Sequence, residues 1–477
     1  MPNFLHGVET VELSNSPLNV VAVKSAIIGL VGIAPKGTKN VLTLVQSQDH
    51  AAQFGSELTG FSIPQAIAAI QAQGPATIFV VNVFDPATHT TAVTAESVTV
   101  TNRKAKTAFA PVGASAPIVT HTSGTPVYVA GTDYTIDDFG NIAILAPIGT
   151  IAEAAVLKVT YAKLDATLIT ADVIKGTNVS GVKTGFKCFL DAYNQLGARP
   201  KILIAPGYSS VNAVATQMIV EANYYKAVCL LDAPTGTTVT GAITARGPAG
   251  SLNFNTSDGR TILLEPGNLK AYDVATNATV NRPYSQFFAG VMAANDSANS
   301  YWYSPSNTII KGVLGSEIPV TAAINDPNTE ANALNEIGIT TVFNSGTSGL
   351  RTWGNRFASY PSVDKAVGFI PVRRTADIVH ESVELSMLDY VDQPINNGTI
   401  DAVRQSVQGF INSLIGRGAL MVGSEITFDP AKNPPSELAA GRAKWTIVFM
   451  SPPPLERMTF ESFIDTSLLK SIGQPTS

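Results

Sequence analysis

The sequence has few charged residues and few cysteines, and both shortages narrow the classes of protein that it can encode. Aspartate, glutamate, lysine and arginine make up 14% of the 477 residues, whereas hydrophobic residues make up 45%. This balance is typical of a chain with a large core, and of a subunit with much buried interface, because charged residues are depleted at interface cores. A chain of this length exceeds one ordinary domain, so about two to four domains are expected.

Long basic runs and long apolar runs are also missing. The net charge is −5, and without a lysine- or arginine-rich stretch to displace phosphate counterions, nucleic acid is not expected as a direct partner. No apolar run reaches the roughly 18 residues that a membrane helix needs. The first residues lack the basic start and apolar centre of a signal peptide. We therefore expect a soluble protein, made in the cytoplasm, that does not insert into a membrane.

The thiols and imidazoles show no metal-binding pattern. Cys188 and Cys229 both lie in apolar stretches, so a disulfide is one alternative and a pair of buried free thiols is the favoured one. No metal and no cofactor is expected, because the histidines are scattered without the spacing of metal ligands (His6, His50, His89, His121 and His380).

One glycine-containing turn is similar to a phosphate-binding loop. Gly32 and Gly37 have the required spacing and are followed by Thr38 and Lys39. However, phosphate loops need lysine before the hydroxyl residue, and Pro35 removes a backbone donor. An ordinary turn after a strand is the favoured interpretation.

A second motif begins like the nucleophile elbow of a hydrolase. Residues 207–211 read GYSSV, so Val211 stands where the elbow needs a glycine for its tight strand-to-helix turn. His380 is the only histidine downstream. A helix N-cap formed by Ser209 or Ser210 explains the motif better, and a hydrolase-like α/β enzyme stays as an alternative function.

Most of the chain predicts an α/β fold. Apolar runs at residues 20–34 and 76–83 are typical of strands buried on both faces, with a helix between them at 61–72. After residue 165 the alternation resumes, with helices at 185–196 and 211–225 and strands at 201–205 and 227–232. This regular alternation predicts a parallel sheet.

Residues 97–165 have a different composition. Threonine and valine dominate, the apolar stretches are short and bounded by turns, and no convincing helix fits. These features predict a small β-sandwich inserted into the α/β core.

The C-terminal part predicts both helix and strand. A helix is expected after an N-cap at Thr399, with strands at 369–379, 444–450 and 457–464 and a stop at 451–454. The apolar face of the helix recurs at helical spacing (Ile400, Val403, Val407, Phe410, Ile411 and Leu414).

The N-terminal residues 4–13 alternate like a strand that has no local partner. Asn15, Ser16 and Pro17 separate this stretch from the rest of the chain. It is either an edge strand of its own sheet or a strand donated to a neighbouring subunit. Composition alone favours the first alternative.

An ordered series of segments resembles one known family. The segments WGNR (353–356), VRRTADIV (372–379) and GRGAL (416–420) follow GLVGIAPKG (29–37), GARPKILIAPG (197–207) and LLDAPTG (230–236). Together they resemble contractile tail sheath proteins of myovirus-type phages and R-type bacteriocins. The resemblance covers most of the chain, in collinear order, apart from residues 97–165.

The resemblance implies a multidomain architecture with arms. It implies an α/β core at 20–96 and 166–350, the β-sandwich at 97–165, a C-terminal α+β domain at 351–456, and extended strand arms at 1–19 and 457–477. It favours donation of the N-terminal strand, because sheath subunits interlock through terminal arms.

The resemblance also implies a structural function without catalysis. Sheath subunits form stacked hexameric rings around a tail tube and contract to drive the tube through the bacterial envelope for genome delivery. The implied partners are other copies of the chain, the tail tube protein, and the baseplate and tail terminator proteins. The implied location is the virion tail, assembled in the host cytoplasm. A bacteriocin sheath, a related injection device and a non-contractile coat protein are the alternatives.

Two groups of residues are candidates for contact between subunits. Arm residues form the first group (Phe4, Leu5, Val8, Val11, Leu13, Thr459, Phe460, Phe463 and Ile464). The second group comprises Arg404 and Arg417 near the helix, and Arg373 and Arg374, which on a strand would point to opposite faces and could meet a neighbour or an acidic tube. For the adjacent pair, the alternative is charge on an exposed edge that discourages aggregation.

Overall fold

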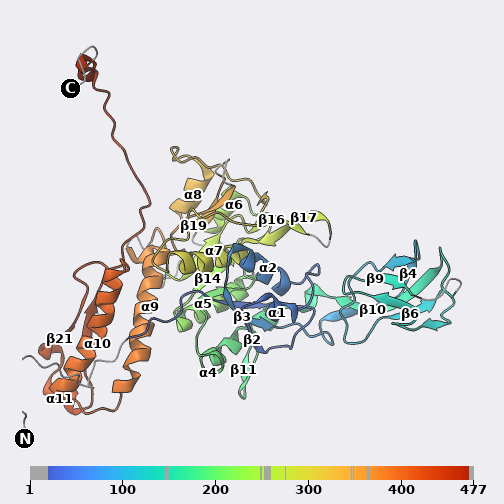
Figure 1. Ribbon diagram of the computed structural model, residues 1–477, viewed down its shortest axis with the longest axis horizontal. Coiled ribbons are helices and arrows are strands. Elements are labelled where there is room, and N and C mark those ends of the chain that lie inside the picture. Colours follow the sequence, from blue (N-terminus) through green and yellow to red (C-terminus); the bar gives the residue numbers. More distant parts are fainter. Residues whose placement is uncertain are drawn as a thin grey trace, which may run out of the picture.

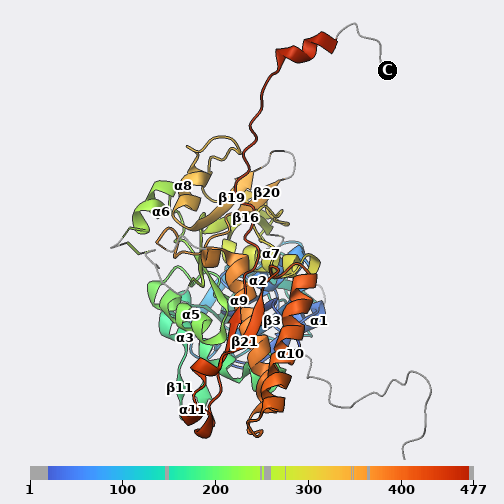
Figure 2. The same ribbon diagram turned by 90° about the vertical axis from the view of Figure 1, so that its left-hand side faces the viewer.

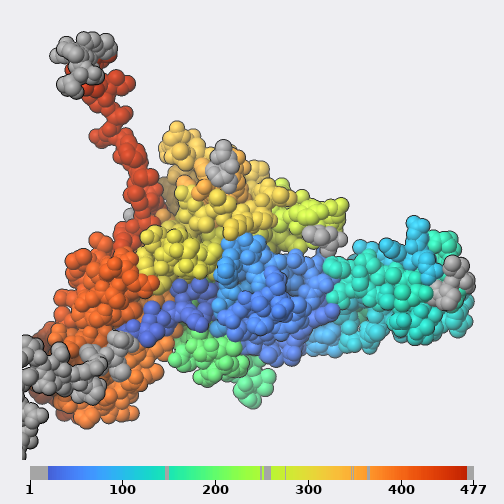
Figure 3. All heavy atoms as spheres, viewed as in Figure 1, coloured from blue at the N-terminus to red at the C-terminus, as the bar shows by residue number. Residues whose placement is uncertain are grey.

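The computed structural model describes residues 20–145, 150–247, 250–251, 259–273, 276–344, 346, 349–362 and 366–471. Figure 1 shows three parts in a row, with a β-rich part at one end, an α/β core in the middle and a helical C-terminal part at the other end. The side view in Figure 2 shows the C-terminal segment leaving the body in an extended form before a short helix. Figure 3 shows the surface of the three parts from the same side as Figure 1.

The core is built on one mixed sheet. In the described chain its strands lie in the order β2 (Leu42–Val45), β3 (Thr77–Asn82), β1 (Ile27–Gly32), β13 (Ile202–Ile204), β14 (Val228–Asp232), β15 (Thr261–Leu264), β19 (Ile339–Asn344) and β20 (Leu350–Trp353). Only the pairings of β2 with β3 and of β19 with β20 are antiparallel. Ile28 on β1 pairs with Ile78 on β3 and Ile202 on β13. The parallel α/β prediction is confirmed.

Helices cover both faces of this sheet. One face packs against α2 (Ile63–Gln73) and α7 (Tyr284–Ala298). The other face packs against α3 (Ala171–Lys175), η2 (Gly185–Asp191), α4 (Ala192–Leu196), α5 (Asn212–Tyr225), α6 (Val239–Ala245) and α8 (Glu330–Glu336). Helices α2 and α7 cross closely because Gly290 has no side chain; a Cβ there would lie 2.9 Å from Ile70 Cα.

Several segments of the core differ from their predictions. Within residues 20–34 only Ile27–Gly32 is a strand, because residues 20–25 run along a helix of the C-terminal part. The expected helix at 185–196 begins as the 3₁₀ helix η2 before it becomes α4. Shorter elements are α1 (Gln48–Ala52), η1 (Ala166–Leu168) and η3 (Ala366–Gly368).

The β-rich part consists of two sheets around a common apolar cluster. One sheet has the order β4 (Thr90–Thr99), β10 (Val156–Leu164), β6 (Ile118–His121) and β7 (Val127–Tyr128), and the other has the order β5 (Lys104–Lys106), β9 (Asn141–Ile144) and β8 (Tyr134–Ile136). Val119, Leu157 and Tyr134 are among the side chains between them. The first strand starts at Thr90, earlier than the predicted insertion.

Two hairpins project from the core. The first joins β11 (Asn178–Val179) to β12 (Val182–Lys183). The second joins β16 (Asn268–Asp273) to β17 (Ala278–Pro283), and β18 (Gly315–Ser316) pairs with β16.

The C-terminal part contains two long helices and a small sheet. Its elements are α9 (Ile370–Ser386), η4 (Met387–Tyr390), α10 (Asn397–Gly416), β21 (Glu425–Phe428), η5 (Pro430–Lys432), α11 (Pro435–Ala439), β22 (Trp445–Val448) and η6 (Thr466–Ser471). Helix α10 matches the predicted helix, although its N-cap is Asn396, whose side chain accepts a 2.9 Å hydrogen bond from Thr399 N–H.

One strand prediction in this part is wrong, and a second predicted strand has no partner in the described chain. Residues 369–379 form most of α9 instead of a strand, with Pro371 in the first turn, where proline is tolerated. Residues 457–464 are extended but pair with no strand of the described chain.

Candidate functional site

Helix α9 joins the C-terminal part to the α/β core through a stripe of charged residues. The stripe has helical spacing and faces partners on several elements of the core (Arg374, Asp377, Glu381 and Glu384). Residues three or four positions apart share one face of a helix. The junction between the two parts is therefore polar.

The buried pair of Arg374 and Asp296 is the most enclosed contact of this stripe. The guanidinium donates to both carboxylate oxygens at 2.8 and 2.5 Å, and to Ser25 O at 3.2 Å. Such bidentate pairs are among the strongest charged contacts in proteins. Since Arg374 is buried and paired inside its own chain, its position gives no support to contact with a neighbour.

The remaining charges of α9 are paired in the same way. Asp377 accepts from Arg260 at 3.1 and 2.7 Å, and it also binds Arg373 one turn earlier. Glu381 binds Lys201, whose Nζ also donates to Tyr225 O at 2.8 Å. Burial lowers the pKa of Lys201, and the Glu381 carboxylate opposes this shift.

The first described residues lie along the same helix. Val21 N–H donates to Ser386 Oγ at 3.2 Å, and Val23 N–H donates to Ser382 Oγ at 3.1 Å. Val20 and Ala22 pack against the apolar cluster of the C-terminal part. The chain therefore enters the described structure beside the C-terminal end of α9.

Helix α10 packs its predicted apolar face on a small cluster separate from the core of the main sheet. The residues predicted for this face that are fully buried are Val403, Val407, Phe410, Ile411 and Leu414. The cluster also includes Val379 of α9 and Ile426 of β21.

The sheet of the C-terminal part has only β21 and β22 in the described chain. On the outer edge of β21, Ile426 N–H donates to Gln408 Oε1 of α10 at 3.0 Å. No strand of the described residues pairs with the outer edge of β22, and Trp445 Nε1 on this strand is buried without a partner there. An unpaired edge of this kind is a template for another strand.

The extended segment after β22 leaves the body and exposes large apolar side chains (Figure 1). Phe460 is 86% exposed and Phe463 is 87% exposed. The segment is fixed at its root, where Arg356 donates to Glu456 at 3.2 and 2.6 Å and lies over the Phe369 ring at 3.9 Å. We call residues 457–471 the C-terminal arm.

The other predicted contact residues have separate positions. Arg404 is exposed on α10 and lies 3.5 Å from Asp401, whereas Arg417 lies over the Trp302 ring at 5.0 Å. The predicted residues of the N-terminal arm fall outside the described residues (Phe4, Leu5, Val8, Val11 and Leu13).

The candidate nucleophile Ser209 is buried and forms a hydrogen bond within the core. Its buried hydroxyl donates to Asp232 Oδ2 at 2.9 Å, and Asp232 also accepts from Ser285 N–H at 2.7 Å. Burial raises the pKa of Asp232 to about 6. Among its described contacts Ser209 has no histidine, so the serine–histidine–acid geometry of the hydrolase alternative is not formed there.

The other residues that the sequence suggested for binding or redox chemistry also have structural surroundings. Lys39 of the phosphate-loop-like turn pairs with Asp85 at 2.9 Å. Cys188 and Cys229 are buried free thiols, as the favoured alternative predicted, and burial raises their pKa values to about 11 and about 12. Across the described ranges, no cluster of three acidic, histidine or cysteine side chains could hold a metal, and no helix has the length and apolarity to cross a bilayer.

Comparison with known proteins matches the chain to one family. A family model described as the phage tail sheath protein central domain matches residues 181–356. The tail sheath protein of Burkholderia phage BcepMu is 44% identical over 472 residues, which cover 98% of each chain. The chain belongs to the tail sheath protein family. The predicted resemblance is thereby confirmed, and this sheath protein is a structural protein of a contractile tail rather than an enzyme.

Further relatives agree with this assignment. A putative prophage major tail sheath protein of Pseudomonas aeruginosa is 34% identical over 288 residues, which cover 60% of this chain and 71% of the relative. The PVC sheath complex of an extracellular contractile injection system, in its contracted state, is 15% identical with a TM-score of 0.60, covering 98% and 99% of the two chains. The contracted helical sheath of the anti-feeding prophage has the same TM-score and identity over 97% and 100%. The structures show a shared fold.

Proposed function

We propose that this sheath protein assembles as stacked hexameric rings around a tail tube, and that its terminal arms join the rings by adding strands to the β21–β22 sheet of neighbouring copies. The observation that carries this proposal is the coexistence of an exposed C-terminal arm and an unpaired edge on β22. Strand addition satisfies main-chain groups on both partners and buries alternate side chains.

The C-terminal arm has the properties of a donated strand. Leaving a phenylalanine or isoleucine in water forgoes about 1.5–3 kcal/mol of burial free energy, and Phe460, Phe463 and Ile464 are all exposed. Residues 451–465 extend over about 50 Å at roughly 3.3 Å per residue. This length is sufficient to reach an adjacent subunit.

The N-terminal arm would start beside the small sheet of the C-terminal part. Val21 and Val23 are bonded to α9, and Val20 packs against the cluster that includes Trp445 and Ile447. We propose the arms at 1–19 and 457–477 that the sequence predicted, with an α/β core between the other parts. The insertion would start at Thr90, where β4 begins, rather than at 97, and the C-terminal domain would start after β20 rather than at 351.

Contraction requires neighbours to stay joined while they rotate. Donated strands keep their main-chain hydrogen bonds, because each arm moves with the sheet that it joins. Force on this sheet would reach the core through the ion pairs of α9, such as Arg374 with Asp296. The stroke would come from an extended, kinetically trapped sheath that relaxes to a state with more buried contact.

The proposed setting is the tail of a virion. Its partners would be the tail tube inside the sheath and the baseplate and terminator proteins at the two ends, and contraction would drive the tube through the bacterial envelope. Arg404 is exposed on α10 and available for an acidic tube or a neighbour. The extensive identity to a phage sheath protein favours a phage tail over a bacteriocin.

Electron microscopy of deletion variants tests the role of the arms. The full chain, expressed with its tube and baseplate proteins, should form hollow, striated tubes of uniform width. Deletion of residues 1–15 or 457–477 should leave folded, soluble monomers that form no tubes, because neither deletion removes a buried part of the described core. Normal tubes from either deletion would refute the role of that arm.

A further inference from the structure

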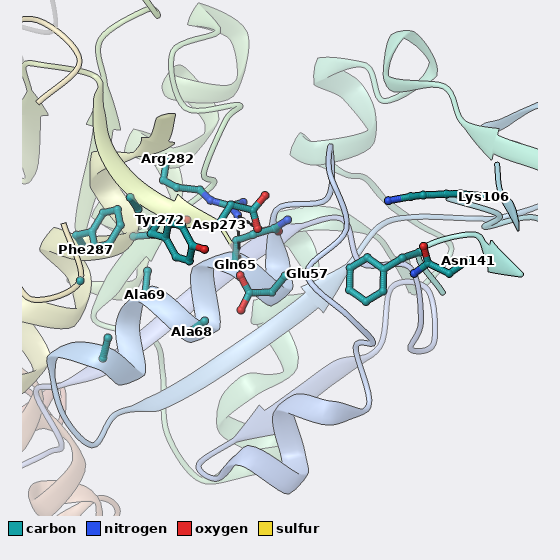
Figure 4. Close-up of a pocket in the computed structure, with 15 residues that line it drawn as sticks. Glu57, Gln65, Ala68, Ala69, Lys106, Asn141, Tyr272, Asp273, Arg282 and Phe287 are labelled. Carbon is teal, nitrogen blue, oxygen red and sulfur yellow. Dashed lines mark ion pairs between the residues drawn. The ribbon is translucent and has the colours of Figure 1, made fainter. Parts of the chain in front are cut away.

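Two arginines of the core differ in their partners. Arg282 borders a cavity of about 630 Å³ between α2, the β16–β17 hairpin and the insertion (Figure 4). Its Nη2 lies 3.6 Å from Asp273 Oδ1 and 3.9 Å from Glu57 Oε2. Arg199 lies just before β13 and has no hydrogen-bond or ion-pair partner in the described chain. The charge of Arg282 is therefore balanced within one chain, whereas the guanidinium of Arg199 can still donate to a carboxylate from outside.

Arg199 is held between two tyrosine rings at the surface. Its Cζ lies 5.8 Å from the ring centroid of Tyr193 on α4 and 5.9 Å from that of Tyr224 on α5. Tyr224 in turn packs edge-to-face on the buried ring of Tyr225, with 5.1 Å between the centroids. Contact with aromatic rings positions a guanidinium while its N–H donors remain available to a carboxylate. A group that is positioned before binding loses less conformational entropy when it pairs.

The exposed face of α5 beside this arginine carries no charge. Glu221 is the one charged residue of α5, and it is buried and paired with Lys187. The exposed side chains recur at helical spacing (Ala213, Thr216, Val220 and Tyr224). Interface cores are depleted in charged residues and enriched in tyrosine and arginine. Tyr193, Arg199, Val220 and Tyr224, which we call the α5 patch, therefore have the composition of an interface.

The turn between α9 and α10 has a complementary composition. Residues 387–395, which we call the acidic turn, contain Asp389 and Asp392 and no basic residue. Both side chains are exposed, and neither carboxylate has a partner among the described residues. Large apolar side chains flank the two acids and are 60%, 62% and 39% exposed (Leu388, Val391 and Ile395). The acidic turn can therefore offer carboxylates and apolar contacts together.

The acidic turn is held in place by the C-terminal part. Tyr390 Oη lies 3.1 Å from Ser406 Oγ of α10, and Gln393 Nε2 donates to Asp389 O at 2.6 Å. Met387 packs against the apolar cluster of the C-terminal part. The two carboxylates thus project from a fixed backbone.

Other exposed apolar segments of the described chain lack this combination. The hairpin tip at 179–182 contains no acid. Asp133 and Glu317, which lie near other exposed apolar residues, already accept hydrogen bonds within the chain. Glu425 is a single acid after the exposed apolar pair at 421–422, and the C-terminal arm is assigned to the β22 edge. Charge complementarity to Arg199 therefore selects the acidic turn.

We propose that the acidic turn of one copy of this chain docks on the α5 patch of another copy. Arg199 would donate to the carboxylates of Asp389 and Asp392, while the apolar side chains of the turn would cover the two tyrosine rings. The contact is head to tail, because each copy uses two different surfaces, and such contacts build open filaments when they do not close. The proposal rests on the self-assembly in the proposed function and adds a contact that does not involve the arms.

A cysteine pair tests the contact in assembled tubes. Val220→Cys and Val391→Cys replace exposed valines on the two surfaces. Mild oxidation of tubes of this double variant should give a ladder of disulfide-linked oligomers on non-reducing gels, because each copy would be linked to two others. Both native cysteines are buried and contribute little background.

The matched control pairs Val220→Cys with Val422→Cys, an exposed valine near the single acid Glu425, and should give no ladder. Intact tubes without a ladder, equal ladders from both pairs, or a disulfide confined to monomers would overturn the proposal.

Charge reversal tests the ion pair separately from the apolar contact. Arg199→Glu places like charges opposite Asp389 and Asp392, so it should reduce tube formation by roughly tenfold or more while the thermal melt of the monomer is unchanged. Adding Asp389→Arg and Asp392→Arg to this variant should restore tubes. Tube formation by Arg199→Glu at the wild-type level, or no restoration by the triple variant, would overturn the contact and leave the proposed function intact. If the wild type forms no tubes even with its tube and baseplate proteins, the proposed function itself fails.

Discussion

The main sheet and the β21–β22 sheet differ in whether an edge strand is covered by another segment of the same chain. At one edge of the main sheet, residues 307–310 cover β20, with hydrogen bonds of 2.7–2.9 Å to Leu350 and Thr352. In the β21–β22 sheet, no such segment of the described chain covers β22. The β20 edge is thus covered within one chain, whereas the β22 edge is open to the strand that we propose another chain donates. Stability should depend on the first region, and assembly on the second.

Two phenylalanines separate these regions most clearly. Phe288 is fully buried against the main sheet, so Phe288→Ala should reduce the free energy of unfolding by about 3–5 kcal/mol. Phe460→Ala, in the exposed C-terminal arm, should change monomer stability by less than about 0.5 kcal/mol but reduce tube formation. Urea denaturation and electron microscopy measure the two effects. A large loss of monomer stability in Phe460→Ala would contradict the comparison.

The junction between the two regions should be sensitive to loss of a single charge. Arg374→Ala leaves Asp296 buried and unpaired, which should cost about 3–5 kcal/mol. Arg404→Ala, on the exposed face of α10, is the control and should cost less than about 0.5 kcal/mol. Chemical denaturation of the monomers measures the unfolding free energy of both variants. Equal effects would mean that the stripe of α9 does not hold the parts together.

A buried acid in the core gives a smaller, pH-dependent effect. Burial, with the nearby Glu317, raises the pKa of Glu265 to about 8. The folded state therefore holds this proton more tightly than the unfolded state, and its stabilising effect is lost as pH rises from about 4.5 to about 8. Since both carboxylate oxygens lack partners in the described chain, Glu265→Gln should be more stable than the wild type at pH 8–9 and similar at pH 5.

Thermal melts between pH 5 and pH 9 measure this effect. The difference in unfolding free energy between Glu265→Gln and the wild type should change by up to about 1.4 kcal/mol per pH unit. Glu461→Gln is the control in the C-terminal arm, and its exposed side chain should leave the profile unchanged. Parallel profiles for Glu265→Gln and the wild type would show that Glu265 does not titrate in this range.

Local patterns in the sequence predicted the regular parts of the fold. The apolar runs of β1 and β3 and the helical spacing of α10 were sufficient to predict these elements, because their burial follows from their own residues. Helix α7 was missed because it is enclosed on nearly all sides and has no polar face to mark its period.

Helix α9 was mistaken for a strand because its buried stripe is charged. Arg374 and Asp377 read as solvent-facing residues alternating with β-branched ones, and only partners far along the chain, such as Asp296 and Arg260, make their burial favourable. The spacing of three and four positions between Arg374, Asp377 and Glu381 was a local signal of a helix. The arm at 457–464 was recognised as apolar and extended, but no local pattern could tell whether its strand partner lies in its own chain.

Hydrogen exchange tests most directly whether the C-terminal part is completed by neighbouring copies. Amide protection would be compared peptide by peptide between monomers and assembled tubes. Residues 445–448 of β22 and residues 457–464 of the C-terminal arm should become strongly protected in tubes, while the main sheet should be equally protected in both states. Tubes in which residues 457–464 exchange as fast as in monomers would contradict completion by neighbouring copies.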